Sequence, residues 1–262
     1  APHHHPTQGI QIRSTYASFQ GRVFLGKRDH EGLPIEVRSP GNVAELKLSL
    51  KTDVLEHYES QTGQRSLDHR MVKQKSATVN LTIEEFTKEN LALALYGNHV
   101  TGSTGSVTAE IIGGSAPVVG DRYFFAHPKV SALVVTDSAG TPATLTAGTH
   151  YTADTDFGAL QFLDVTGFTA PFKVAYSYGV ATEIGIFTQA LPERYLRLEG
   201  INTAQGNAKV LVELYRVAFD PLKEISFISD EYNKFELEGS LLADTAKPYD
   251  AVLGQFGRIG QL

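Results

Sequence analysis

The sequence predicts a mainly β protein, a β-sandwich or barrel with one short flanking α-helix and an inserted small β module. Three observations lead to this fold class. Most segments alternate apolar and polar residues with a period of two, the pattern of half-buried strands. A single stretch after residue 86 has the start and stop signals of a helix. Residues 117–179 change in composition and are interrupted by turn signals, which is typical of short strands.

The clearest strand covers residues 43–51. It places Leu46, Leu48 and Leu50 on one face and charged or hydroxyl side chains on the other. Its expected partner is the segment 78–84, whose alternate aliphatic residues point inward in the same way. Further strands are expected at residues 17–25, 194–201, 209–219 and 234–242, with a Gly- and Pro-rich loop at 26–41.

The helix is expected to begin after Thr87, whose hydroxyl can accept a hydrogen bond from a free backbone N–H at the helix start. It runs through the Leu-Ala-Leu-Ala-Leu stretch 91–95. We expect it to end at Gly97, since glycine tolerates the left-handed conformation that follows many helices.

At 262 residues the chain is long enough to bury a core in one large β domain or two smaller ones. We expect an N-terminal arm at 1–16, a discontinuous main domain at 17–116 and 180–245, and a flexible C-terminal tail at 246–262. Residues 117–179 are expected to be an inserted module. The alternative is that their strands belong to one continuous sandwich.

Between the two clearest strands, residues 52–74 are expected to form a loop, much longer than the usual hairpin connection of about two to five residues. Acidic residues gather before Gly63 and basic residues after it, interrupted by Asp68. A loop with segregated charge can dock against a second copy of itself. The plain alternative is a solvated mobile loop.

Composition excludes several classes of protein. With no cysteine, the chain has no disulfide, no thiolate metal site and no cysteine nucleophile. The net charge of -6 and the lack of a basic stripe argue against tight binding of nucleic acid. No secretion signal is visible, and no run approaches the about 18 apolar residues of a membrane span, so we expect a soluble protein.

Catalytic and metal-binding patterns are weak, and we predict no catalytic, cofactor or metal site. The histidines are scattered except for His3, His4 and His5, which can hold a metal ion only weakly on a mobile arm. The segment 102–106 lacks the glycine spacing of a serine nucleophile elbow. The carboxylate pairs at 84–85 and 230–231 are adjacent in sequence, so they would not converge on one cleft.

Two segments carry a family resemblance. They are Leu55-Glu-His-Tyr-Glu-Ser-Gln-Thr-Gly-Gln-Arg65 and Val79-Asn-Leu-Thr-Ile-Glu-Glu-Phe-Thr-Lys-Glu-Asn-Leu-Ala-Leu-Ala-Leu-Tyr-Gly97. In this order the chain resembles the tail tube (major tail) protein of long-tailed bacteriophages. The resemblance covers residues 18–97 and returns more weakly over 183–245, at the segments 219–221, 229–232 and 235–239.

The resemblance implies a structural protein of the virion rather than an enzyme, made in the cytoplasm of the bacterial host. Hexameric rings would stack into a tail tube that conducts DNA without binding it specifically or contacting a membrane. The inserted module 117–179 would lie on the outer surface of this tube. Other expected partners are the tape measure, tail terminator and distal tail proteins. We expect these residues of the long loop to contact the next ring: Asp53, Glu56, His57, Tyr58, Glu59, Arg65, Asp68, Arg70 and Lys73.

The strands 43–51, 78–84 and 234–242 are the candidates for the wall of the channel. Their candidate lumen-facing residues are Glu45, Thr78, Asn80, Thr82, Glu236 and Glu238. Lys47 and Lys51 fit poorly beside a uniformly acidic channel. Two other functions stay open: a secretion-system tube of the same fold, and a carbohydrate-binding β-sandwich. The eleven tyrosines of the chain would allow carbohydrate binding, but the chain has no tryptophan, which such proteins commonly expose.

Overall fold

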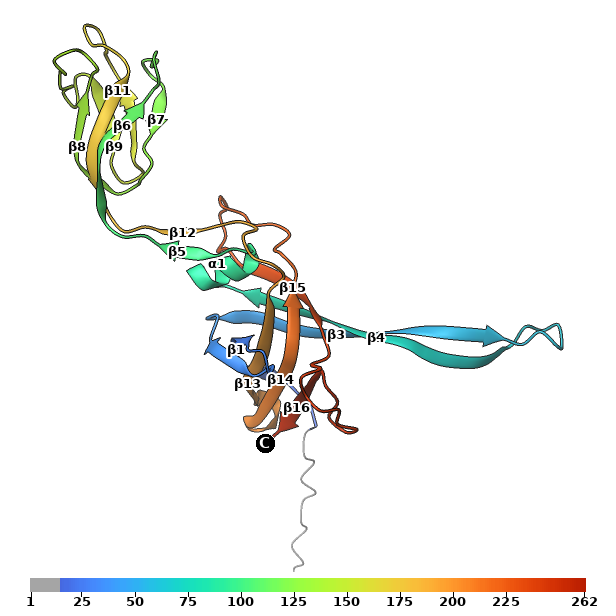
Figure 1. Ribbon diagram of the computed structural model, residues 1–262. Helices are drawn as coiled ribbons and strands as arrows, with labels where there is room; N and C mark the ends of the chain where they lie inside the picture. Colours follow the sequence, from blue (N-terminus) through green and yellow to red (C-terminus); the bar gives the residue numbers. More distant parts are fainter. Residues whose placement is uncertain (1–14) are drawn as a thin grey trace, which may run out of the picture. The chain divides into compact units, whose positions relative to one another are not determined.

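The computed structural model describes residues 15–262, so the cluster of His3, His4 and His5 and nearly all of the expected arm 1–16 lie outside the described residues. The predicted mainly β fold is confirmed (Figure 1). The chain divides into two compact units. Unit 1 comprises the residues up to 98 and residues 185–262, and unit 2 comprises residues 99–184.

Unit 1 is built on an antiparallel sheet of eight strands within the described residues, in the order β2-β1-β13-β14-β15-β4-β3, with β16 paired to β14. The elements are β1 (Phe19–Arg28), β2 (Pro34–Arg38), β3 (Val43–Tyr58), β4 (Leu67–Ile83), α1 (Lys88–Ala94), β13 (Glu193–Asn202), the 3-10 helix η1 (Thr203–Gln205), β14 (Ala208–Phe219), β15 (Phe235–Leu241) and β16 (Gly257–Gln261).

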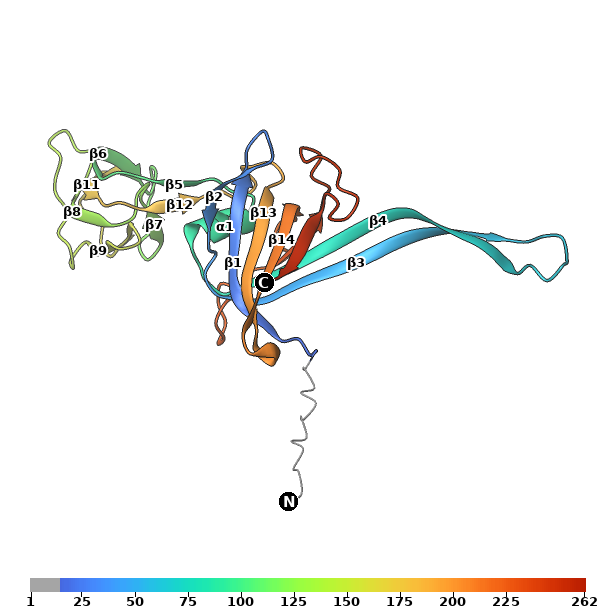
Figure 2. The ribbon, with the colours of Figure 1, turned by 90° about the horizontal axis from the view of Figure 1, so that it is seen from below.

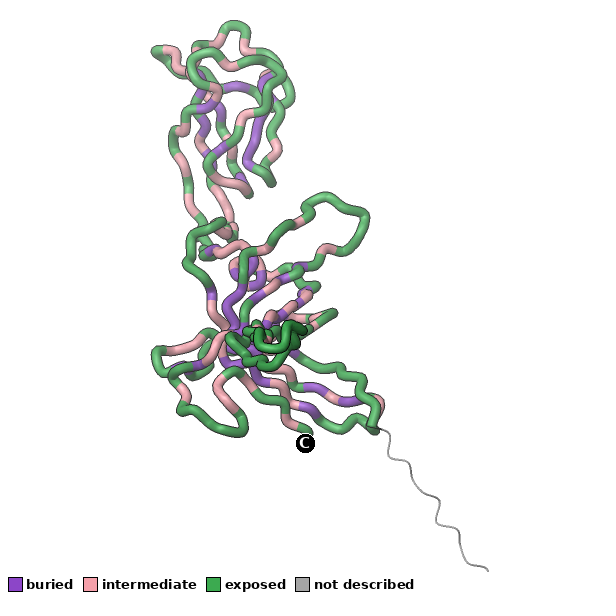
Figure 3. The backbone as a smooth tube through the Cα atoms, turned by 90° about the vertical axis from the view of Figure 1, so that its right-hand side faces the viewer, coloured by how far each residue is buried: buried purple, intermediate pink, exposed green. Residues whose placement is uncertain are grey.

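The core of unit 1 lies on one face of this sheet. Phe219, Phe235 and Leu81 are fully buried there together with the inward residues of β1 and β13. The helix α1 adds Leu93 and Ala94 to the same cluster, so it packs as the predicted flanking helix. Figure 3 shows the buried residues of unit 1 gathered along these strands, away from its exposed loops.

The ends of α1 partly match the prediction. The Thr87 side chain accepts a hydrogen bond from the backbone N–H of Asn90 at 3.2 Å, as expected of the N-cap. The C-terminal prediction was wrong in its residue, because Tyr96, with φ 52°, takes the left-handed conformation. The N–H of Gly97 then bonds to the carbonyl of Ala92 at 2.8 Å and closes the helix end.

Two other sequence expectations were also wrong in unit 1. The segment 26–41 contains β2, which pairs with the end of β1. The C-terminal residues contain β16, which pairs with β14 from Val210↔Gln261 to Leu214↔Gly257. All five residues of this strand are exposed or half-buried, so no alternation of buried and exposed side chains marks it in the sequence.

Unit 2 has its own core between two three-stranded sheets, β7-β10-β9 and β6-β11-β8. Phe162, Phe172 and Val135 lie at its centre. The predicted module 117–179 lies inside this unit, which begins earlier because β6 pairs with β11. Its strands are β5 (His99–Thr101), β6 (Gly105–Ile112), β7 (Arg122–Phe124), β8 (Val130–Thr136), β9 (Tyr151–Asp154), β10 (Ala159–Phe162), β11 (Phe172–Tyr178) and β12 (Thr182–Ile184).

Candidate assembly surface

The segment expected to be a long loop is a β-hairpin, so that prediction was wrong. Strands β3 and β4 stay paired from Lys51↔Ser76 outward to Tyr58↔Leu67, and residues 59–66 close the turn. We call residues 51–76 the hairpin arm. In Figures 1 and 2 it runs past the other strands of the unit 1 sheet. Nearly every residue of the arm is exposed, so its sequence lacks the one-sided apolar pattern by which strands are recognised.

An apolar stripe continues from the core onto this arm. Along β3 the inward face is only partly buried at Leu46, 40% exposed at Leu48 and 77% exposed at Leu50. Farther out, Val72 of β4 is 51% exposed. A two-stranded hairpin has little stability of its own in water, and exposed apolar stripes commonly mark contact surfaces. The arm is therefore suited to lie against another surface.

The charges that looked segregated in the sequence are neighbours across the arm. Arg70 lies directly opposite Glu56, with 3.4 Å between Arg70 Nε and Glu56 Oε1. The Tyr58 hydroxyl donates to the same carboxylate at 3.1 Å, and this hydrogen bond raises the pKa of Tyr58. Asp68 accepts a hydrogen bond from His57, and this bond is the main cause of the lowered pKa of Asp68. The acidic limb, β3, and the basic limb, β4, thus lie side by side, and the arm as a whole presents mixed charge.

A carboxylate organises the turn of the arm. Glu59 accepts hydrogen bonds from the backbone N–H groups of Gln61 at 2.8 Å and Thr62 at 2.9 Å, and from the Thr62 hydroxyl. These bonds, with the one from the Thr62 hydroxyl first, lower the pKa of Glu59 to about 2. Arg65 follows with φ 51°, so the turn bends through a left-handed residue.

The structure distributes the predicted ring-contact residues over three parts of the arm. Asp53, Glu56, His57 and Tyr58 lie on β3, Glu59 and Arg65 lie in the turn, and Asp68, Arg70 and Lys73 lie on β4. Sequence reasoning missed one pairing, His57 directly opposite His69. The two are twelve positions apart, and only recognition of the hairpin register would have revealed it.

The six candidate lumen-facing residues share one face of the sheet. Thr82 of β4 lies between Glu45 of β3 and Glu236 of β15. In the next row, Asn80 lies between Lys47 and Glu238, and Thr78 follows in register beyond them. The opposite face of β4 and β15 is buried in the core, and that of β3 is only partly covered. The structure therefore brings these residues together as one polar face, which no single strand showed.

Lysines balance the acidic residues of this polar face. Lys47 Nζ lies 2.9 Å from Glu45 Oε1, and Lys223 Nζ lies 2.9 Å from Glu238 Oε2. Lys51 is in register on the same side and lies 3.7 Å from Asp53. The pairing removes the difficulty that two lysines posed for the sequence interpretation, because the face is mixed in charge.

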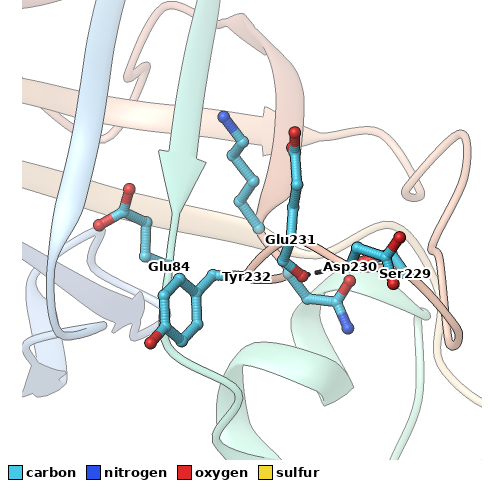
Figure 4. Close-up of a pocket in the computed structure, with 7 residues that line it drawn as sticks. Glu84, Ser229, Asp230, Glu231 and Tyr232 are labelled. Atoms are coloured by element: carbon cyan, nitrogen blue, oxygen red, sulfur yellow. Dashed lines mark hydrogen bonds between the residues drawn. The ribbon is translucent and has the colours of Figure 1, made fainter.

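An open groove runs over the polar face, bordered by the segment 221–234 that precedes β15. Its volume is about 980 Å³, and Glu45, Glu236 and Glu238 line its floor. At its end a second hollow is lined by Glu84 and residues 229–234 (Figure 4). There the Ser229 hydroxyl donates to the Glu231 carbonyl at 2.8 Å, and Tyr232 is 99% exposed. Both hollows are open surfaces rather than closed sites.

The carboxylate pairs considered in the sequence have distinct surroundings. Glu84 and Glu85 both bind Asn42: its side-chain amide donates to Glu84, and its backbone N–H donates to Glu85 at 3.0 Å. They fasten the start of β3 to the end of β4. Asp230 and Glu231 are both exposed on the loop before β15. Neither pair faces a closed cleft.

Ion pairs made by two buried carboxylates, Glu213 and Asp244, hold the C-terminal segment to the sheet. Glu213 of β14 accepts from Arg197 at 2.9 Å and from Arg258 of β16 at 3.0 Å. Burial by itself would raise the pKa of Glu213, but the bond from Arg258 and the two positive charges outweigh it and lower the pKa. Farther along, Arg28 bonds to the buried Asp244 at 2.5 Å. The C-terminal residues are thus part of the folded unit.

Over residues 15–262, the helices are too short and too polar to cross a membrane. In the same part of the chain, no group of three or more His, Cys, Asp or Glu side chains is arranged to hold a metal ion.

The fold and this surface define a mainly antiparallel β protein with a projecting hairpin arm and a polar sheet face. Residues 16–260 match the family described as Protein of unknown function UCP028589, and the chain belongs to this family. No curated protein matches the chain.

Proposed function

We propose that this chain is a tail tube subunit of a long-tailed bacteriophage, assembling with copies of itself into stacked hexameric rings that conduct DNA. The observation that carries the proposal is the hairpin arm with its exposed apolar stripe. Leu50 is 77% exposed and Val72 is 51% exposed, although both continue a paired sheet. A contact between copies would bury this stripe and stabilise the ribbon.

The sheet edges support the same proposal. Within the described strand order, β2 and β3 end the sheet, so each has one side without a strand partner. Such edges pair readily with other chains. A ring of copies joined through these edges would satisfy their backbone groups, as closure does in a barrel.

The polar face suits the wall of a channel for DNA. Lys47 pairs with Glu45 and Lys223 pairs with Glu238, and among its described residues the face lacks the clustered cations that hold phosphates. In this proposal duplex DNA passes without specific binding. Unit 2 then lies on the outer surface, and the tape measure, terminator and distal tail proteins are the partners at the tube ends.

Truncation of the arm tests the proposal. Residues 52–75 are replaced by a two-residue Asn-Gly turn that joins Lys51 to Ser76, which are cross-strand partners in the native register. We expect a folded subunit that forms no tubes in negative-stain microscopy. The matched control replaces only residues 60–64 of the turn with Gly and Ser, keeping the apolar stripe, and should still form tubes.

Two outcomes would contradict the proposal. Tubes of normal length from the truncated protein would show that the arm is dispensable for assembly. A wild-type protein that stays monomeric at every concentration and salt condition tested would remove the basis for a tube subunit.

A further inference from the structure

Two histidines lie directly opposite each other near the outer end of the hairpin arm. His57 of β3 is the register partner of His69 of β4, and both are exposed. Residues directly opposite in an antiparallel pair project to the same face, with Cβ atoms about 4.5–5.5 Å apart. The register therefore presents two imidazoles side by side to solvent.

A carboxylate orients the first of these rings. His57 Nδ1 lies 2.6 Å from Asp68 Oδ1. An ionised carboxylate can only accept a hydrogen bond, so Nδ1 carries the hydrogen and the lone pair is on Nε2. Metal-binding histidines are commonly held by the same carboxylate contact, which sets the tautomer and the direction of the ligating nitrogen.

The neighbouring residues on this face carry no positive charge that would repel a metal ion. The adjacent cross-strand pair is Leu55 with Met71, which is uncharged. Alternation places Glu56 and Arg70 on the other face, where they pair with each other at 3.4 Å. The positive charge of Arg70 is thus both turned away and matched by a carboxylate.

We propose that His57 and His69 together bind a divalent transition metal ion such as Zn²⁺ or Ni²⁺, with Asp68 as the positioning residue. Imidazole nitrogen suits these ions, whereas Ca²⁺ and Mg²⁺ prefer oxygen ligands. The site has two protein ligands, because the described residues contain no group of three or more His, Cys, Asp or Glu side chains arranged to hold a metal ion. Water or a side chain of a second copy completes the coordination. The site does not depend on the proposed tube function.

Calorimetric titration of the full chain with ZnCl₂ and with NiCl₂ tests this site. Every protein carries Asn at positions 3, 4 and 5, because three adjacent histidines also take up these ions. We expect saturable binding of one ion per chain. His57→Gln or His69→Gln should abolish it, and Asp68→Asn should weaken it roughly 10- to 100-fold.

His30→Gln is the matched control. His30 is exposed in unit 1, and its Nε2 lies 3.6 Å from Glu31, but β-pairing places no histidine opposite it. Its replacement should leave the affinity unchanged, and circular dichroism should show all variants folded. Nitrogen-detected NMR should show the metal-induced shift at His57 Nε2. Equal affinity in His57→Gln and wild type, an equal loss in His30→Gln, or no saturable binding would each overturn the proposal.

Discussion

The inner and outer halves of β3 and β4 are one continuous pair of strands in two different environments. In the inner half, Leu81 and Val79 are fully buried between β3 and β15. In the outer half the same two strands have no third strand beside them, and Leu50 and Val72 are open to solvent. The difference teaches that strand pairing alone does not stabilise a sheet; the inner half is held by its core, and the outer half lacks one.

The largest effect on folding should come from the inner half. Leu81→Ala removes a fully buried side chain and leaves a cavity. We expect a loss of about 2–5 kcal/mol in the free energy of unfolding, measured by denaturant titration. A loss below about 0.5 kcal/mol would mean that the inner half is not the core of unit 1.

The second-largest effect on stability should come from the charged contact between β14 and β16. Glu213→Gln removes the negative charge and one of the two carboxylate oxygens that Arg197 and Arg258 share, and hydrogen bonds to charged groups contribute about 1.5–3 kcal/mol. Because the pKa of Glu213 is lowered by folding, its contribution is present above the unfolded value and is lost as pH falls through the folded value. Wild type should therefore lose more stability than the variant on going from pH 6 to pH 3. Identical losses in the two proteins would contradict this account.

A substitution in the outer half should impair assembly and leave the stability of the monomer almost unchanged. Leu50→Ser leaves the monomer within about 0.5 kcal/mol of wild type, since the side chain is 77% exposed. The same change should sharply reduce tube formation, because it places a polar group in the proposed contact stripe. Light scattering and microscopy give the assembly readout, and Lys51→Ser, a neighbour on the polar face, serves as the control. Strong destabilisation of the Leu50→Ser monomer would show that the arm is held within the subunit.

The smallest effect concerns the turn of the arm. The amide signals of Gln61 and Thr62 should titrate with the Glu59 carboxylate at about pH 2 in NMR spectra, well below the ordinary value of 4.5. Because the pKa is lowered by folding, the turn keeps these hydrogen bonds above that value and loses them as pH falls through about 2. A midpoint near 4.5 would mean that the carboxylate does not cap the turn.

The sequence by itself determined the elements that carry their own periodicity or end signals. The inner halves of β3 and β4, the N-cap at Thr87 and the strands β13 to β15 all followed from local alternation or capping chemistry. The strands among these elements each bury one face, so apolar and polar residues alternate along them. The same patterns predicted the polar face formed by Glu45, Asn80 and Glu236.

The tertiary structure alone decided the hairpin arm, the pairing of β16 and the register that sets His57 opposite His69. An exposed ribbon buries neither face, so no alternation distinguishes it from a loop. Strand β16 depends on backbone pairing with β14 and on the bond from Arg258 to Glu213, a contact between distant residues. Cross-strand neighbours are set by register, and register is a property of two segments together, which a single segment does not encode.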